Sequence, residues 1–111
     1  MEERRIHPRI SISYYLRVTE DSTDTVLGYI LDISKSGVRL LSDEKLVEGE
    51  VRTGRMDLSL IMNFEQRIVF DITPVWNTPG KDGQTEYGCL YSGLDERNLT
   101  IIKQLIEQFS D

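Results

Sequence analysis

The sequence predicts a mainly β protein, a small antiparallel barrel with one helix at its C-terminal end. About six short runs of alternating or apolar residues are separated by polar turns, a spacing typical of small barrels. From residue 95 onward, apolar residues recur at steps of three and four, which is the period of one helix face. The length of 111 residues suits one hydrophobic core, so we expect a single domain over 1–111.

The N-terminal segment, 1–11, is charged and contains His7-Pro8. A residue before proline is pushed towards extended geometry, so we interpret this segment as a flexible arm that leads into the barrel. The barrel itself is expected over 12–93. Its strands are predicted at 12–19, 25–34, 38–42, 66–77 and 86–92, with a dense apolar patch inside 55–64.

Turn residues separate these strands. Glu20–Asp24 and the run Pro79-Gly80-Lys81-Asp82-Gly83 have the composition of hairpin turns. The helix is predicted over 95–109, with Asp95 as its N-cap. Its buried stripe is expected to comprise Leu99, Ile102, Leu105 or Ile106, and Phe109.

Charge and composition exclude several classes of protein. The net charge of −6 has the wrong sign for a DNA- or RNA-binding protein, which needs a broad basic face. No apolar run approaches the ~18 to 20 residues of a membrane span, and no secretion signal opens the chain. One cysteine cannot form an internal disulfide, so we expect a cytoplasmic protein without membrane insertion.

Two short stretches concentrate the chemistry. Asp32-Ile33-Ser34-Lys35-Ser36-Gly37 ends an apolar strand, and strand alternation should point Asp32 and Ser34 away from the face that Leu31 and Ile33 bury. Gly37 permits a positive φ, or the approach of a ligand or another backbone. The second stretch is the arginine cluster Arg4-Arg5-Ile6-His7-Pro8-Arg9.

These residue types suit a guanine nucleotide. Arginine forms bidentate pairs with phosphate or with the O6/N7 edge of guanine, and it stacks on bases. An ionised aspartate accepts hydrogen bonds from the N–H groups on the Watson–Crick edge of guanine. An isolated phosphate would be repelled by Asp32, whereas a dianionic molecule that carries guanines satisfies both kinds of partner.

In this order the two stretches resemble the motifs of PilZ domains, bacterial receptors for the second messenger cyclic di-GMP. Arg5-Ile6-His7-Pro8-Arg9 matches RxxxR, and residues 32–37 match [D/N]xSxxG. Val75-Trp76 and Tyr87-Gly88-Cys89-Leu90-Tyr91 are similar to the late strands of the family, and the terminal helix falls where the family has one. The resemblance covers essentially the whole chain and implies a six- or seven-stranded barrel that binds ligand on its outer surface.

The resemblance also implies roles for single residues. Arg5 and Arg9 would grip phosphates and guanine faces, Asp32 and Ser34 would engage a guanine, and Gly37 would allow its close approach. Arg4 precedes the first motif arginine. In similar proteins an arginine at this position accompanies binding of an intercalated ligand dimer, so the resemblance favours two nucleotides per protomer.

Structural interpretations compete with these roles. An arginine cluster alone is usually a solvated arm, and Asp-x-Ser-x-x-Gly alone is usually a turn with side-chain to backbone hydrogen bonds. We interpret Trp76 as a core residue, with a place near the site as the alternative. Arg39 is interpreted as facing solvent, with an extension of the basic rim as the alternative.

Nothing in the sequence supports an enzyme or a cofactor. Cys89, inside a strand, is interpreted as a small buried apolar residue, and His7, on the flexible arm, is not expected to meet it as a catalytic dyad requires. Soft metal ligands at useful spacing are lacking. The Gly-Lys turn at 79–83 does not have the phosphate-loop pattern.

The function we expect is that of a cyclic di-GMP receptor, an allosteric regulator that passes ligand binding to a downstream partner protein by ordering its arm. The alternative is a ligand-independent adaptor that docks another protein through its barrel or helix. A barrel that binds single-stranded RNA is a third option, which the acidic balance disfavours.

Overall fold

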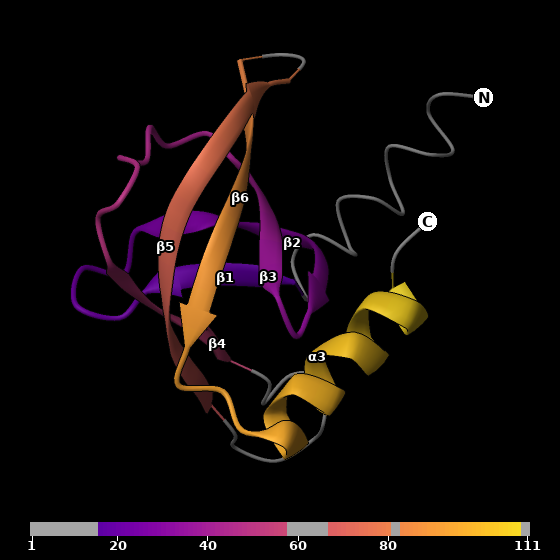
Figure 1. The fold of residues 1–111 in the computed structure, drawn as a ribbon. Helices are drawn as coiled ribbons and strands as arrows, with labels where there is room; N and C mark the ends of the chain where they lie inside the picture. The colour runs from indigo at the N-terminus through magenta and orange to yellow at the C-terminus, as the bar shows by residue number, and fades with distance from the viewer. Residues whose placement is uncertain (1–15, 58–66, 81–82, 110–111) are drawn as a thin grey trace.

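The computed structural model describes residues 16–57, 67–80 and 83–109. Within them, six strands close into an antiparallel barrel in the order β1-β2-β3-β6-β5-β4, followed by one helix (Figure 1). The predicted fold class is therefore confirmed. The elements are β1 (Arg17–Glu20), β2 (Val26–Ser34), β3 (Gly37–Ser42), β4 (Arg52–Asp57), β5 (Arg67–Pro79), β6 (Thr85–Ser92) and α3 (Glu96–Phe109).

The barrel interior holds the hydrophobic core, because alternate residues of each strand point inward. Strand β5 contributes Phe70, flanked by Ile68 and Ile72, and all three are buried. The other strands contribute buried residues of similar kind: Val18, Leu27, Ile30, Ile33, Val38, Leu40, Met56, Tyr87 and Cys89.

Helix α3 lies against the barrel, close to β2 (Figure 1). It begins as predicted, because Asp95 Oδ1 accepts a hydrogen bond of 2.8 Å from the amide of Asn98, the arrangement of an N-cap. Leu99, Ile102 and Leu105 are buried against the core, which confirms these three positions of the predicted stripe. The side chain of Phe109, the last predicted position, lies outside the part that the structure describes. The helix thus contributes core residues, and the outer face of β3, β6 and β5 is left uncovered by it.

Strand β4 was not predicted at Arg52–Asp57, because only Gly54 and Met56 on it are buried and its sequence is otherwise polar. The apolar patch expected within 55–64 lies largely at 58–66, outside the described residues. The first half of the strand expected over 12–19 also lies outside them, and the described part is β1 with buried Leu16 just before it.

Candidate functional site

The β2–β3 turn carries the serine and glycine of the predicted motif. Ser34 Oγ accepts a hydrogen bond of 3.2 Å from the amide of Ser36 and lies 2.9 Å from Ser36 Oγ. The Tyr91 hydroxyl on β6 donates to the carbonyl oxygen of Ser34 at 2.7 Å. Ser34 therefore helps to build the turn, as in the structural interpretation, while its side chain remains exposed.

Gly37 is required by a neighbouring strand and does not use a positive φ. A Cβ atom at residue 37 would lie 2.8 Å from the carbonyl oxygen of Cys89, a contact that no real side chain makes. Its φ is not in the left-handed region, unlike those of Gly49, Gly83 and Gly93. Of the reasons we expected for this glycine, the approach of another backbone is the one observed.

A bulge in β2 sets the direction of Asp32. Ile30 pairs with Leu40 and Asp32 pairs with Arg39, so Leu31 is an extra residue without a partner on β3. The extra residue reverses the alternation, which buries Ile33 and leaves Asp32 exposed. The outward direction of Asp32 and Ser34 was predicted correctly, but burial of Leu31 was wrong, since that side chain is 36% exposed.

A second bulge, in β5, sets the direction of Trp76. Pro74 pairs with Cys89 and Trp76 pairs with Gly88, so Val75 is the extra residue on β5. Unbroken alternation from buried Ile72 and Pro74 would have placed Trp76 in the core. With the bulge, the indole is on the outer surface and 43% exposed, so the core interpretation of Trp76 was wrong.

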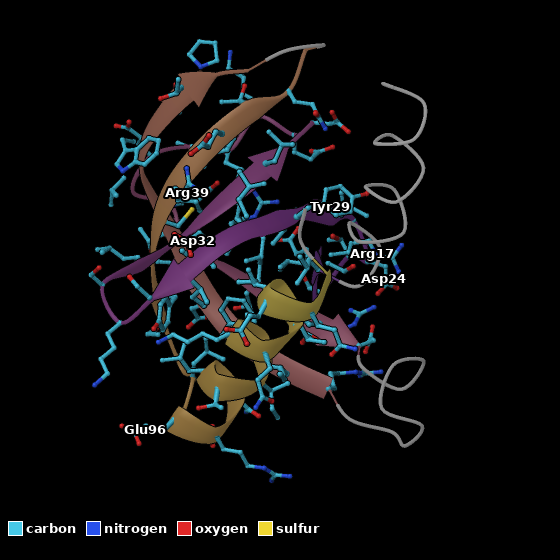
Figure 2. The ribbon with its side chains drawn as sticks, turned by 90° about the vertical axis from the view of Figure 1, so that its right-hand side faces the viewer. Arg17, Asp24, Tyr29, Asp32, Arg39 and Glu96 are labelled. Atoms are coloured by element: carbon cyan, nitrogen blue, oxygen red, sulfur yellow. The ribbon has the colours of Figure 1, made fainter. Side chains whose placement is uncertain are left out.

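These two bulges align four residues in one row across the outside of the barrel. The pairing runs from Asp32 on β2 to Arg39 on β3, Gly88 on β6 and Trp76 on β5. Figure 2 shows Asp32 and Arg39 next to each other at one side of the molecule. We call this set the outer row.

The outer row crosses a hollow of about 290 Å3. Its floor is the backbone of β3 and β6, and the exposed side chains of Val75 and Leu90 add apolar surface at one side. The motif residues and the outer row thus share one concave surface. The residues that line it are Asp32, Ser34, Ser36, Gly37, Val38, Arg39, Val75, Trp76, Gly88, Cys89 and Leu90.

Gly88 allows the indole of Trp76 to lie against the strand. A Cβ atom at residue 88 would collide with the Cε2 and Nε1 atoms of the Trp76 ring. The absence of that atom lets the ring lie against β6 while the side chain stays 43% exposed. A glycine inside a strand and a proline inside the paired strand both signal such irregularity, so Gly88 and Pro74 could have indicated a bulge near Trp76, while the strand pairing that defines the bulge is seen only in the structure.

The charges at the hollow are mixed. Arg39 Nη1 lies 2.7 Å from Glu86 Oε2, and the arginine side chain remains 47% exposed. The carboxylate of Asp32 accepts a hydrogen bond of 2.9 Å from the amide of Ile33. The solvent-facing interpretation of Arg39 therefore holds, but it missed both the ion pair and the place of Arg39 in the hollow.

The remaining predicted site residues, Arg4, Arg5 and Arg9, lie outside the described residues, as does His7. Cys89 is buried beneath the hollow, and this burial raises the pKa of its thiol to about 11, which keeps it protonated and unreactive. Among the described residues, no group of three or more His, Cys, Asp or Glu side chains could hold a metal ion. No described helix is both long and apolar enough to cross a membrane.

Comparison with known proteins agrees with this architecture. No curated protein matches the chain. The family profile described as "PilZ domain" matches residues 3–108, which is nearly the whole sequence and includes both motifs, the outer row and all but the last residue of helix α3. The chain therefore belongs to the PilZ domain family.

Proposed function

We propose that this protein is a receptor for cyclic di-GMP that binds the nucleotide in the hollow on the outer face of β2, β3, β5 and β6. The observation that carries the proposal is the outer row, which sets an exposed carboxylate, a guanidinium and an aromatic face side by side next to the β2–β3 turn. Each of these groups matches one feature of a guanine nucleotide.

Asp32 supplies the acceptor for guanine. Its carboxylate is exposed, and a hydrogen bond from the neighbouring amide of Ile33 fixes its orientation while leaving further lone pairs free. Trp76 supplies a flat apolar surface, and stacking of a base on an aromatic side chain contributes about 1–3 kcal/mol. Together they favour a guanine over a small inorganic anion.

The size of the hollow supports a role for the arginine-rich segment in binding. At about 290 Å3, it is close to the lower limit of about 300 Å3 for small-molecule sites, and it is too small to enclose a cyclic dinucleotide. Arg5 and Arg9, with Arg4, would cover the exposed part of the ligand and neutralise its phosphates. The described residues that line the hollow do not supply that positive charge by themselves, because Arg39 is accompanied there by Asp32 and is paired with Glu86 outside the hollow.

Binding of this kind can transmit a signal. Ordering of an N-terminal segment costs about 1–2 kcal/mol per fixed residue, and charge-assisted arginine contacts of roughly 1.5–3 kcal/mol each can offset it. The bound state would present a rearranged segment and a changed surface charge to a partner protein. In this proposal the protein is a regulator without catalytic activity.

Titration calorimetry with cyclic di-GMP tests the site. We expect binding by the wild type, and Arg9→Ala and Asp32→Ala should each weaken it by about tenfold or more, the effect of losing one charge-assisted hydrogen bond. Asp32→Asn should retain most of the affinity, because the amide oxygen still accepts from guanine and the motif admits asparagine.

Matched controls come from exposed charges away from the hollow. Arg97→Ala, on α3, and Glu48→Ala, in the loop after β3, should bind like the wild type with unchanged melting temperatures. Absence of heat and of a thermal shift at ligand concentrations well above micromolar would contradict the proposed function. Wild-type affinity in Asp32→Ala would mean that the nucleotide binds elsewhere.

A ligand-independent adaptor is the second candidate, favoured by the exposed apolar side chains of Val75, Trp76 and Leu90 on one face. Such a face could dock a protein without any nucleotide. The two candidates differ in one measurement, the set of proteins that an immobilised sample retains with and without cyclic di-GMP. A set that does not change, combined with no binding of nucleotide, would favour the adaptor.

A further inference from the structure

Arg39 occupies the centre of the outer row but is paired with an acid outside it. On β3 it lies between Asp32 on one side and Gly88 with the Trp76 ring on the other. Among the described residues, its ion-pair partner is Glu86, at 2.7 Å, and not Asp32, which is its direct neighbour across the strands. The guanidinium is therefore drawn along the barrel surface towards Glu86.

The register explains this geometry. Arg39 pairs with Gly88 and Leu41 pairs with Glu86, so Arg39 and Glu86 are diagonal neighbours on the outer face of β3 and β6. Glu86 does not line the hollow, whereas Arg39 does. Glu86, which lies outside the hollow, therefore holds the guanidinium of Arg39 away from the space that a ligand would fill.

We propose that Glu86 competes with the bound nucleotide for Arg39, so that Glu86 lowers the affinity of the site and Arg39 is a further ligand-binding residue. This inference rests on the proposed function. A phosphate, or the O6/N7 edge of a guanine, offers Arg39 a bidentate partner in place of Glu86. The apparent affinity is then reduced by the fraction of molecules in which Glu86 holds the guanidinium.

The pair has the properties of a contact that can exchange. It is a single ion pair between side chains that both remain partly exposed, and such pairs are weak. Arg39 makes no hydrogen bond to a backbone carbonyl among the interactions of the described residues. A ligand anion that is desolvated in the hollow can therefore displace Glu86 from it.

Four proteins test the inference by calorimetry with cyclic di-GMP: the wild type, Glu86→Gln, Arg39→Ala and the double variant. Loss of a partly exposed ion pair should tighten binding of Glu86→Gln by about two- to fivefold. Arg39→Ala should weaken binding by about tenfold. In the double variant, Glu86→Gln should have no further effect, because no guanidinium remains to be released.

The double variant separates competition from simple repulsion. Removal of a negative charge near an anionic ligand could tighten binding through space, but that effect would persist in the Arg39→Ala background and would overturn the inference. Wild-type affinity in Glu86→Gln or in Arg39→Ala would overturn it as well, while the proposed function would stand.

The remaining outcome concerns both proposals. If neither the wild type nor Glu86→Gln binds, the proposed function and this inference are both overturned. Glu48→Gln, an exposed acid in the loop after β3, serves as the control and should leave the affinity unchanged.

Discussion

The arginines on β4 and the arginine at the hollow, Arg39, differ in how many carboxylates they contact. On β4, Arg55 contacts the carboxylates of Asp24, Asp57 and Asp21 at 2.6, 3.2 and 3.7 Å, and its side chain is only 15% exposed. At the hollow, Arg39 has one acid, Glu86. Figure 2 places Asp24 and Arg39 at opposite sides of the molecule.

Arg52, also on β4, and further contacts of Arg55 show the same dense pairing. Arg52 forms a two-pronged pair with Glu20, in which Nε and Nη2 donate to the two carboxylate oxygens at 2.8 and 2.9 Å. Arg55 also donates to the backbone carbonyls of Glu20 and Asp21. These contacts tie the β1–β2 turn to β4, so this cluster is structural, whereas Arg39 has only one ion pair, between side chains that are both partly exposed.

The largest effect on folding is expected from Gly88→Ala, at the hollow. The added Cβ must displace the Trp76 ring, and overpacking of this kind destabilises by roughly 1–3 kcal/mol. Denaturant unfolding measures the loss, and emission of Trp76, the sole tryptophan, reports the movement of the ring. In a Trp76→Ala background, Gly88→Ala should cause little further loss in the free energy of unfolding. Unchanged stability and emission in the single variant Gly88→Ala would show that the ring does not lie against β6.

A smaller effect should distinguish the two arginine groups directly. Arg52→Ala removes both hydrogen bonds to Glu20 and should lower the free energy of unfolding by at most about 1 kcal/mol, without changing nucleotide affinity. Arg39→Ala should show the reverse pattern, with weaker binding and an unchanged melting temperature. If both variants lose stability equally, the contrast between structural and available arginines is wrong.

The smallest effect is expected in the pH dependence of stability. The hydrogen bond from Arg52 lowers the pKa of Glu20 below its ordinary value of 4.5, with a further contribution from Thr23 against the opposing effect of burial. For Asp57, burial would raise the pKa, but the hydrogen bonds from Arg67 and Arg55 outweigh it and lower the pKa below 3.8.

Both carboxylates therefore stabilise the fold fully above their ordinary pKa values. That contribution is lost as the pH falls through the lower values of the folded state, because the unfolded chain takes up protons first. Thermal melts between pH 7 and pH 3 should show a shallower decline below about pH 4.5 for Glu20→Gln than for the wild type. Parallel curves would mean that the pair with Arg52 does not contribute to acid stability.

Elements with a strong local pattern could be predicted from the sequence. The predicted 25–34, 38–42 and 86–92 strands agree with β2, β3 and β6 to within one residue at each end, and the Asp95 cap marked the start of α3. Polar β4 was missed because its sequence lacks an apolar alternation. At the site, the sequence indicated Asp32, Ser34 and Gly37, but not how Arg39 and Trp76 would join them.

The sequence by itself determined the barrel, its terminal helix and the motif residues, because alternation, helical period, capping and turn composition act over a few neighbouring residues. The tertiary structure alone decided the outer row. Extra residues at Leu31 and Val75 are defined only when β2 pairs with β3 and β5 pairs with β6, and each one reverses the direction of every side chain that follows it. That reversal brings Trp76 out of the expected core and places it in line with Asp32 and Arg39.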